Sequence, residues 1–143
     1  MMKDKFYLIV AGSRGYNNYF QFHQVLDYVL SNQKQKRKIV IVSGGARGTD
    51  SLAELYAKER GYEFKVFPAD WDTYGKRAGY IRNEQMHSYI SGHTNRGCIC
   101  FWDMESKGTK QNFGLSYSKN TRLIVFNYLG NTFLKKEEIQ KHI

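Results

Sequence analysis

Three glycine-containing turns carry the residue types in this chain that are best suited to binding an anion. The longest, Ser43-Gly44-Gly45-Ala46-Arg47-Gly48-Thr49-Asp50, follows an apolar run over residues 39–42 and precedes a helical pattern. Glycine allows the backbone to turn tightly and to approach a ligand closely. The first turn of a helix adds unpaired N–H groups and the positive end of the helix dipole. The order of strand, glycine-rich turn and helix therefore predicts a phosphate-binding loop.

Two other glycine-containing turns also follow apolar runs. Gly12-Ser13-Arg14-Gly15 follows the apolar run 6–11, and Ser106-Lys107-Gly108-Thr109 comes shortly after the apolar run 98–102. In an open parallel sheet, ligands bind at the carboxyl ends of the strands. Turns that converge on that edge would form one site, although each turn taken alone is also an ordinary connection between a strand and a helix.

A second segment rich in functional side chains, residues 68–86, follows the third strand pattern. Arg82 and Asn83 are expected near the start of a helix, where they would hold a phosphate or a ribose. Trp71, or a tyrosine close to it, would cover a base. The alternative is structural: Trp71 would anchor the segment on the core, and Arg82 would pair with an aspartate of the same segment.

Apolar periodicity predicts the regular elements that must position these turns. Strands are expected at residues 5–11, 38–43, 62–67, 97–102 and 121–127. Helices are expected at residues 18–31, 50–60, 80–91 and 109–119, with a short charged helix at 134–142 and a loop at 69–79. Alternating strands and helices predict an α/β fold, a doubly wound, mainly parallel sheet of about five strands with helices on both faces. We expect one domain over residues 1–143, with the tail 130–143 peripheral.

The overall charge favours a phosphorylated or polyanionic partner. The chain has 143 residues, and 22 Lys and Arg against 13 Asp and Glu give a formal net charge of +9. Such a charge attracts nucleotides and nucleic acids alike, so it does not separate these two partners. No apolar run approaches the ~20 residues of a membrane span, and the N-terminus lacks the apolar core of a secretion signal. We therefore expect a cytoplasmic protein with no membrane partner.

The two cysteines, Cys98 and Cys100, lie two positions apart in an apolar run. We expect them to be buried thiols on opposite faces of a strand, not linked to each other, in a reducing cytosol. A zinc site needs more ligands at better spacing, so no metal site is predicted. The pattern requires no cofactor, and it is compatible with Mg²⁺ that accompanies a phosphorylated ligand.

Taken together, these motifs resemble those of the SLOG superfamily, and more narrowly its YspA/YpsA-related branch, also called the DUF2493 group. The resemblance rests on the three turns and on the segment 68–86, and it spans about residues 5–127. It implies a Rossmann-like nucleotide-binding fold. More distant members are DNA-processing protein A, which binds single-stranded DNA, and the Lonely guy phosphoribohydrolases, which cleave a base from a nucleoside monophosphate. The ligand-sensing domain of Thoeris defence proteins, which binds cyclic ADP-ribose isomers, is also related.

The hydrolase motif of the superfamily, Gly-Gly-x-Gly-Thr-x-x-Glu, is only partly present in this chain. Two residues separate Gly45 from Gly48, and Leu52 stands where the motif has its glutamate. The nearby carboxylates Asp50 and Glu54 are therefore only weak candidates for catalysis. The local pattern is closer to the Ser-Gly-x-Ala-x-Gly-Ile-Asp of DNA-processing protein A.

We interpret the chain as a protein that binds a nucleotide or a nucleotide-derived signalling ligand, such as an ADP-ribose derivative. It would act as a sensor or as a sequestering protein, including in phage counter-defence. The alternatives are a hydrolase of the N-glycosidic bond of a nucleoside monophosphate and a single-stranded nucleic-acid-binding protein. The residues expected to contact the ligand are Gly12, Ser13, Arg14, Gly44, Gly45, Ala46, Arg47, Gly48, Thr49, Asp50, Trp71, Arg82, Asn83, Asp103, Ser106, Gly108 and Thr109. We also expect a homo-oligomer, because the high aromatic content suits a buried interface.

Overall fold

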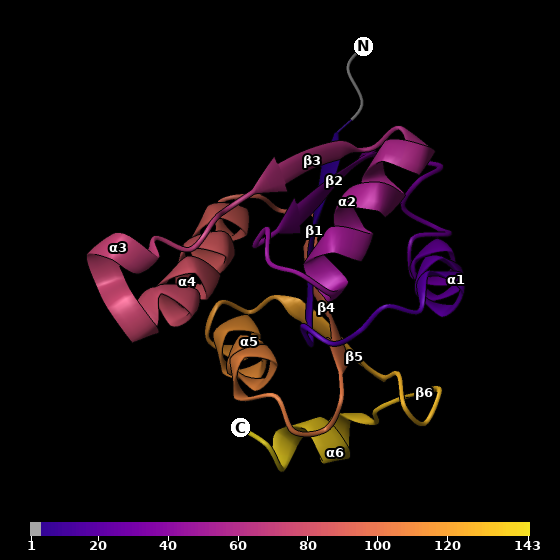
Figure 1. Ribbon diagram of the computed structural model, residues 1–143. Coiled ribbons are helices and arrows are strands. Elements are labelled where there is room, and N and C mark those ends of the chain that lie inside the picture. Colours follow the sequence, from indigo (N-terminus) through magenta and orange to yellow (C-terminus); the bar gives the residue numbers. More distant parts are fainter. Residues whose placement is uncertain (1–3) are drawn as a thin grey trace.

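The computed structural model describes residues 4–143, which form one mixed sheet flanked by helices (Figure 1). Its strands are β1 (Lys5–Gly12), β2 (Lys38–Ser43), β3 (Glu63–Val66), β4 (Arg96–Trp102), β5 (Arg122–Asn127) and β6 (Thr132–Phe133). Their spatial order is β3-β2-β1-β4-β5-β6. The first five are parallel to their neighbours, and β6 is antiparallel to β5. The strand order reverses between β1 and β4, so this pair is the topological switch point of the sheet.

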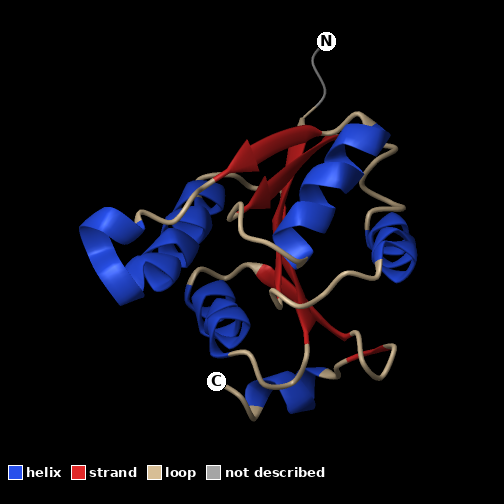
Figure 2. Ribbon diagram, viewed as in Figure 1, coloured by secondary structure: helices blue, strands red, loops and turns tan. Residues whose placement is uncertain are grey.

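Helices cover both faces of this sheet, as Figure 2 shows. They are α1 (Tyr19–Val29), α2 (Thr49–Arg60), α3 (Trp71–Tyr74), the 3-10 helix η1 (Gly75–Arg77), α4 (Ala78–Ser91), α5 (Lys107–Ser118) and α6 (Lys136–Gln140). One apolar core lies beneath α1 and α2, and a second lies beneath α4, α5 and α6. The predicted doubly wound α/β class is therefore confirmed. In residues 4–143 no helix has the length and apolar character needed to cross a membrane.

β1 illustrates why the central strands form where they do. Leu8 and Val10 enter the core beneath α1 and α2, whereas Tyr7 and Ile9 enter the core beneath α4 and α5. A strand that is covered on both faces is apolar at successive positions, which explains the continuous apolar runs in the sequence. Each large apolar side chain that is fully buried contributes roughly 1.5–3 kcal/mol.

The structure contains short elements that the sequence did not predict. Residues 69–79, expected as a loop, contain α3 and η1, and α4 begins within them. Asp70 caps α3, because its Oδ1 accepts a hydrogen bond from Thr73 N at 3.1 Å. Elements as short as α3 and β6 show no recognisable periodicity. Within the tail expected to be peripheral, Ile139 of α6 is buried in the second core.

Cys98 and Cys100 are buried free thiols, as expected, but the prediction of opposite faces is wrong. Both side chains lie in the core beneath α4 and α5, with their Sγ atoms 3.9 Å apart. Side chains two positions apart on a strand point to the same face, so the spacing itself dictates this arrangement.

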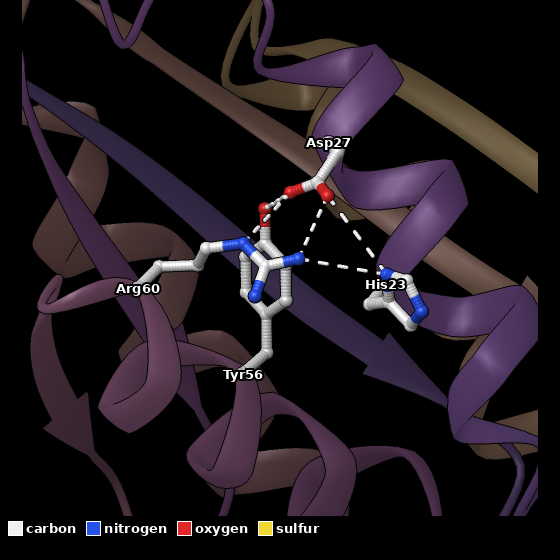
Figure 3. A network of polar contacts seen from close by, with 4 residues as sticks. All are labelled: His23, Asp27, Tyr56 and Arg60. Atoms are coloured by element: carbon white, nitrogen blue, oxygen red, sulfur yellow. Dashed lines mark hydrogen bonds and ion pairs between the residues drawn. The ribbon is translucent and has the colours of Figure 1, made fainter.

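A polar network joins α1 to α2, the helix that follows the longest glycine turn (Figure 3). Asp27 accepts hydrogen bonds from Tyr56 Oη at 2.6 Å and from Arg60 Nε and Nη2 at 3.1 and 2.7 Å. His23 Nδ1 lies 3.9 Å from Asp27 Oδ2. The hydrogen bonds from Arg60 and then Tyr56 hold the pKa of Asp27 below its usual value, although burial opposes them. This network fixes α2 against α1.

Candidate ligand-binding site

The carboxyl ends of β1, β2 and β4 open into two adjoining cavities of about 420 Å³ each. The first, here called the α5 cavity, lies between the turn after β1 and the N-terminus of α5. The second, the loop cavity, lies against the turn 44–47 and the start of the segment after β3. Arg14, Ala46, Trp71 and Arg82 line both cavities. The two cavities therefore form one cleft near the switch point.

Arg82 reaches from α4 into the wall between the two cavities. Its side chain is buried, and Nη1 donates a hydrogen bond to the Gly44 carbonyl at 2.6 Å. Its Nε is buried without a hydrogen-bond partner among the described residues. Burial lowers the pKa of Arg82, and the nearby charge of Asp50 opposes this effect. A Cβ at residue 44 would overlap the Arg82 guanidinium, so glycine at this position leaves room for that side chain.

Gly48 and Thr49 hold the turn after β1 in place rather than line the cleft. Thr49 donates to the Ser13 carbonyl from its backbone N at 3.3 Å and from Oγ1 at 2.9 Å. Gly48 has a φ of +75°, and a Cβ at this position would collide with the Arg14 backbone. The two glycine turns predicted from the sequence are thus packed directly against each other.

The N-terminus of α5 forms one end of the α5 cavity. Ser106 caps this helix through a hydrogen bond from Thr109 N to Ser106 Oγ at 3.5 Å. Asp103 Oδ1 accepts hydrogen bonds from the backbone N of Glu105 at 2.9 Å and of Ser106 at 2.8 Å. Burial raises the pKa of Asp103, but these backbone hydrogen bonds bring it below its usual value. The 12-residue helix directs its positive end towards the cavity.

Ser13 supplies a hydroxyl that is free for a ligand. It is 4% exposed, and its Oγ makes no hydrogen bond of ordinary geometry with the described residues. The side chain lies near Asp103, whose pKa it helps to lower. A buried hydroxyl normally finds a partner, so this one is suited to hydrogen-bond a ligand group that enters the cavity.

Arg14 and Trp71 form the outer rim shared by both cavities. The guanidinium carbon of Arg14 lies 5.7 Å from the centroid of the Trp71 ring, which is cation–π distance. Trp71 is 49% exposed, so it does not anchor the segment in the core. Nor does Arg82 form an ion pair with an aspartate of that segment within the described residues. Because about half of Trp71 is exposed, part of the indole remains accessible to a stacking base.

Asp50, near the N-terminus of α2, lies in the wall of the α5 cavity. Its Oδ2 accepts a hydrogen bond from Ala46 N at 3.0 Å. Burial raises the pKa of Asp50, and the Ala46 N–H and the charge of Arg82 oppose the increase. This hydrogen bond therefore links Ala46, in the middle of the glycine turn, to the first turn of α2.

Side-chain amides connect α4 to α5 behind the cavity. Asn83 Nδ2 donates to the Gly108 carbonyl at 3.3 Å and to Gln111 Oε1 at 2.9 Å. Asn112 Nδ2 donates to the same carbonyl at 3.3 Å, and its Oδ1 lies 2.9 Å from His87 Nε2. These contacts set the position of the α5 N-terminus relative to Arg82.

The structure brings most of the predicted ligand residues to the cleft. Those that line it are Gly12, Ser13, Arg14, Gly44, Gly45, Ala46, Arg47, Asp50, Trp71, Arg82, Asn83, Asp103, Ser106, Gly108 and Thr109. The walls formed by residues 4–143 do not include Gly48, Thr49 or Glu54, and Glu54 instead pairs with Lys58 at 3.2 Å. Sequence reasoning missed several lining residues, of which Tyr80 lies in the segment 68–86 and Asn112 one turn after Gly108. In the same residue range, no three His, Cys, Asp or Glu side chains gather as a metal site.

Residues 6–74 match the model of the family described as "YspA, cpYpsA-related SLOG family". The match covers just under half of the chain. The matched residues include the turns after β1 and β2 and Trp71, and they end before α4 and the turn at α5. The resemblance read from the motifs is therefore confirmed.

Two further comparisons give individual proteins to which this chain is similar. The Gene 61 protein of Mycobacterium phage D29 is 45% identical over 53 residues, which cover 34% of this chain and 42% of that protein. The chain thus matches less than half the length of this curated relative. A solved structure, described as a predicted subunit of tRNA methyltransferase from Methanocaldococcus jannaschii DSM, aligns over 95% of this chain and 73% of that chain. Its identity is 14% and its TM-score is 0.40.

Proposed function

We propose that this protein binds a phosphorylated nucleotide or nucleotide-derived ligand in the cleft. The observation that carries this proposal is the burial of Arg82, which is 8% exposed and lines both cavities. The charge of Asp50 acts on it from nearby, but no carboxylate within residues 4–143 forms a direct ion pair with its guanidinium. A buried charge is costly unless an anion accompanies it. A phosphate group in the cleft would supply that anion.

The chemistry of the walls supports an orientation for such a ligand. The phosphate would lie beside Arg82, Ser13 Oγ and the first N–H groups of α5, which together offer charge, a free hydroxyl and a helix dipole. The base would stack on the exposed face of Trp71, and Asp103 would accept a hydrogen bond from a ribose hydroxyl.

We propose binding without turnover, because Leu52 stands where the hydrolase motif has its glutamate and Glu54 pairs with Lys58 outside the cleft walls. A hydrolase needs a carboxylate that is free to activate water or to stabilise positive charge on the sugar. The protein would then act as a sensor, or would sequester a signalling nucleotide. In a phage, sequestering such a nucleotide would serve counter-defence, and the similar Gene 61 protein comes from Mycobacterium phage D29.

Single-stranded nucleic acid is a second candidate, favoured by one specific observation. The exposed aromatic side chains of Trp71, Tyr74 and Tyr80 lie on the short segment that also carries Lys76 and Arg77. Aromatic faces stack bases and nearby cations follow the phosphate backbone. Binding of this kind weakens steeply with salt, because it releases counterions.

The test is a thermal-shift titration of the purified protein with AMP, ADP-ribose, NAD, a cyclic dinucleotide and a short oligothymidine. Each ligand that binds is recovered and analysed by chromatography. A saturable shift with a small nucleotide, recovered intact, would support the proposal. Recovery of a free base would make the protein a hydrolase, and a shift only with the oligonucleotide, lost in moderate salt, would favour the second candidate. If none of the small nucleotides stabilises the protein, the proposal is refuted.

Two arginine variants separate a specific contact from net charge. Arg14→Gln removes a cation from the rim of both cavities and should weaken nucleotide binding by about tenfold, the typical value of a charge-assisted hydrogen bond. Arg122→Gln removes the same charge from an exposed position of β5 outside the cleft walls and should leave the affinity unchanged. Equal losses in the two variants would mean that only the overall charge matters.

A further inference from the structure

The outer edge of β5 is only partly covered. β5 pairs with β4 from Arg122 to Asn127, whereas its pairs with β6 are Phe126 with Phe133 and Asn127 with Thr132. One more hydrogen bond, from Leu134 N to the Val125 carbonyl at 2.9 Å, extends this contact by one position. The segment 122–124 has no strand on its outer side within residues 4–143.

A groove of about 1050 Å³ runs along this free edge, which makes it larger than either cavity of the cleft. One wall is the C-terminal end of α1, and the opposite wall is formed by the ends of α5 and α6. The C-terminal end of α1 and the ends of α5 and α6 thus flank the free edge of β5. A further strand of the sheet would fit in the space between these helices, next to β5.

The backbone at this edge can accept such a strand. Successive residues of a strand direct their N–H and C=O groups to opposite edges. Because the Val125 carbonyl bonds to Leu134 on the outer side, Leu123 also presents its N–H and C=O outwards. An added strand would pair with Leu123 and with the N–H of Val125, and it would extend the sheet where β6 ends.

The groove is apolar at its base and carries only positive charge. Tyr28 is 73% exposed and Phe133 38% exposed, and their ring centroids lie 6.1 Å apart across the groove end. Arg122 and Lys136 are the charged residues of its walls within the described chain, and no Asp or Glu lines it. A second copy of this chain, with a net charge of +9, would be repelled here, whereas an acidic segment would be attracted.

We propose that this groove binds an extended, acidic segment of a partner protein, which adds a strand to the free edge of β5. The main-chain hydrogen bonds of the edge supply affinity, and alternate side chains of the segment meet the apolar wall and the two cations. The interaction is separate from the nucleotide cleft, which lies at the carboxyl ends of β1, β2 and β4.

The test uses the full chain and two fluorescein-labelled peptides, one of alternating valine and glutamate and one of alternating valine and lysine. Fluorescence anisotropy measures binding, and backbone NMR shifts at Leu123 and Val125 locate it. We expect saturable binding of the glutamate peptide alone. The double variant Arg122→Glu/Lys136→Glu, altered only at exposed positions, should bind this peptide at least about tenfold more weakly and should gain affinity for the lysine peptide.

The variant Leu123→Pro removes the outward N–H while keeping a residue that an edge strand tolerates, and it should abolish binding. Urea unfolding checks that Leu123→Pro is folded. The variant Arg122→Glu/Lys136→Glu tests peptide binding at the same groove without altering the backbone. Equal binding of both peptides, or no saturable binding, would overturn the proposal. So would a dimer in sedimentation that Leu123→Pro dissociates, because the edge would then belong to a second copy.

Discussion

Replacing Gly44 by alanine tests whether its carbonyl and its missing side chain position the buried arginine of the cleft. A Cβ at this position would come within 2.6 Å of Arg82 Cζ and 2.8 Å of Cδ. The φ of Gly44 is not positive, so alanine is compatible with the backbone and the collision with Arg82 is the main effect. Relief requires the guanidinium to move away from the Gly44 carbonyl, to which it donates at 2.6 Å.

The expected cost follows from the bond that is lost. A hydrogen bond from a charged group contributes about 1.5–3 kcal/mol, and Arg82 is buried, so little solvent replaces it. We expect Gly44→Ala to lower the free energy of unfolding by about 2 kcal/mol, or the Tm by roughly 6–10 °C for a chain of this size. The variant should also lose affinity for a nucleotide ligand, because the cation leaves its position between the two cavities.

Urea unfolding followed by circular dichroism measures this change. Gly114→Ala is the matched control, because Gly114 lies inside α5 and a Cβ there meets nothing within 4 Å. Alanine in a helix interior should stabilise the protein by roughly 0.5–1 kcal/mol. If Gly44→Ala is as stable as the parent and binds nucleotide equally well, then Arg82 is not held by this contact and the reasoning about the cleft fails.

Three other predictions concern the residues that hold the cleft and α2 in place and the fluorescence signal of ligand binding. Thr49→Val removes the 2.9 Å hydrogen bond to the Ser13 carbonyl and should cost about 1–2 kcal/mol in urea unfolding, with weaker ligand binding measured by calorimetry. Asp27 has a lowered pKa in the folded state, so its stabilising effect is present above its unfolded pKa near 4 and is lost as pH falls through the folded pKa. The variant Asp27→Asn should therefore be less stable than the parent at pH 7. Its urea midpoint should also fall less steeply as the pH is lowered. Trp71 is 49% exposed whereas Trp102 is 1% exposed, so nucleotide stacking should quench the fluorescence of Trp71. Trp71→Phe should abolish this quenching.

Much of the fold could be predicted from the sequence because the central strands are buried on both faces. Their continuous apolar runs mark β1, β2 and β4, and parallel strands place the turns that follow them at one edge. The short elements α3 and β6 escaped prediction, because their formation depends on a single cap at Asp70 and on pairing with β5. The error about Cys98 and Cys100 was one of strand geometry, since residues two apart share a face.

The sequence by itself determined the α/β class, the three glycine turns and the residue types gathered around the cleft, because local periodicity and backbone freedom are properties of short segments. Only the tertiary structure decided what each residue does there. Thr49 bonds across 36 positions to Ser13, and Arg82 bonds across 38 positions to Gly44. Such contacts depend on how the strands are ordered and how the helices pack. The same is true of the uncovered edge of β5, which exists because β6 stops short of Leu123.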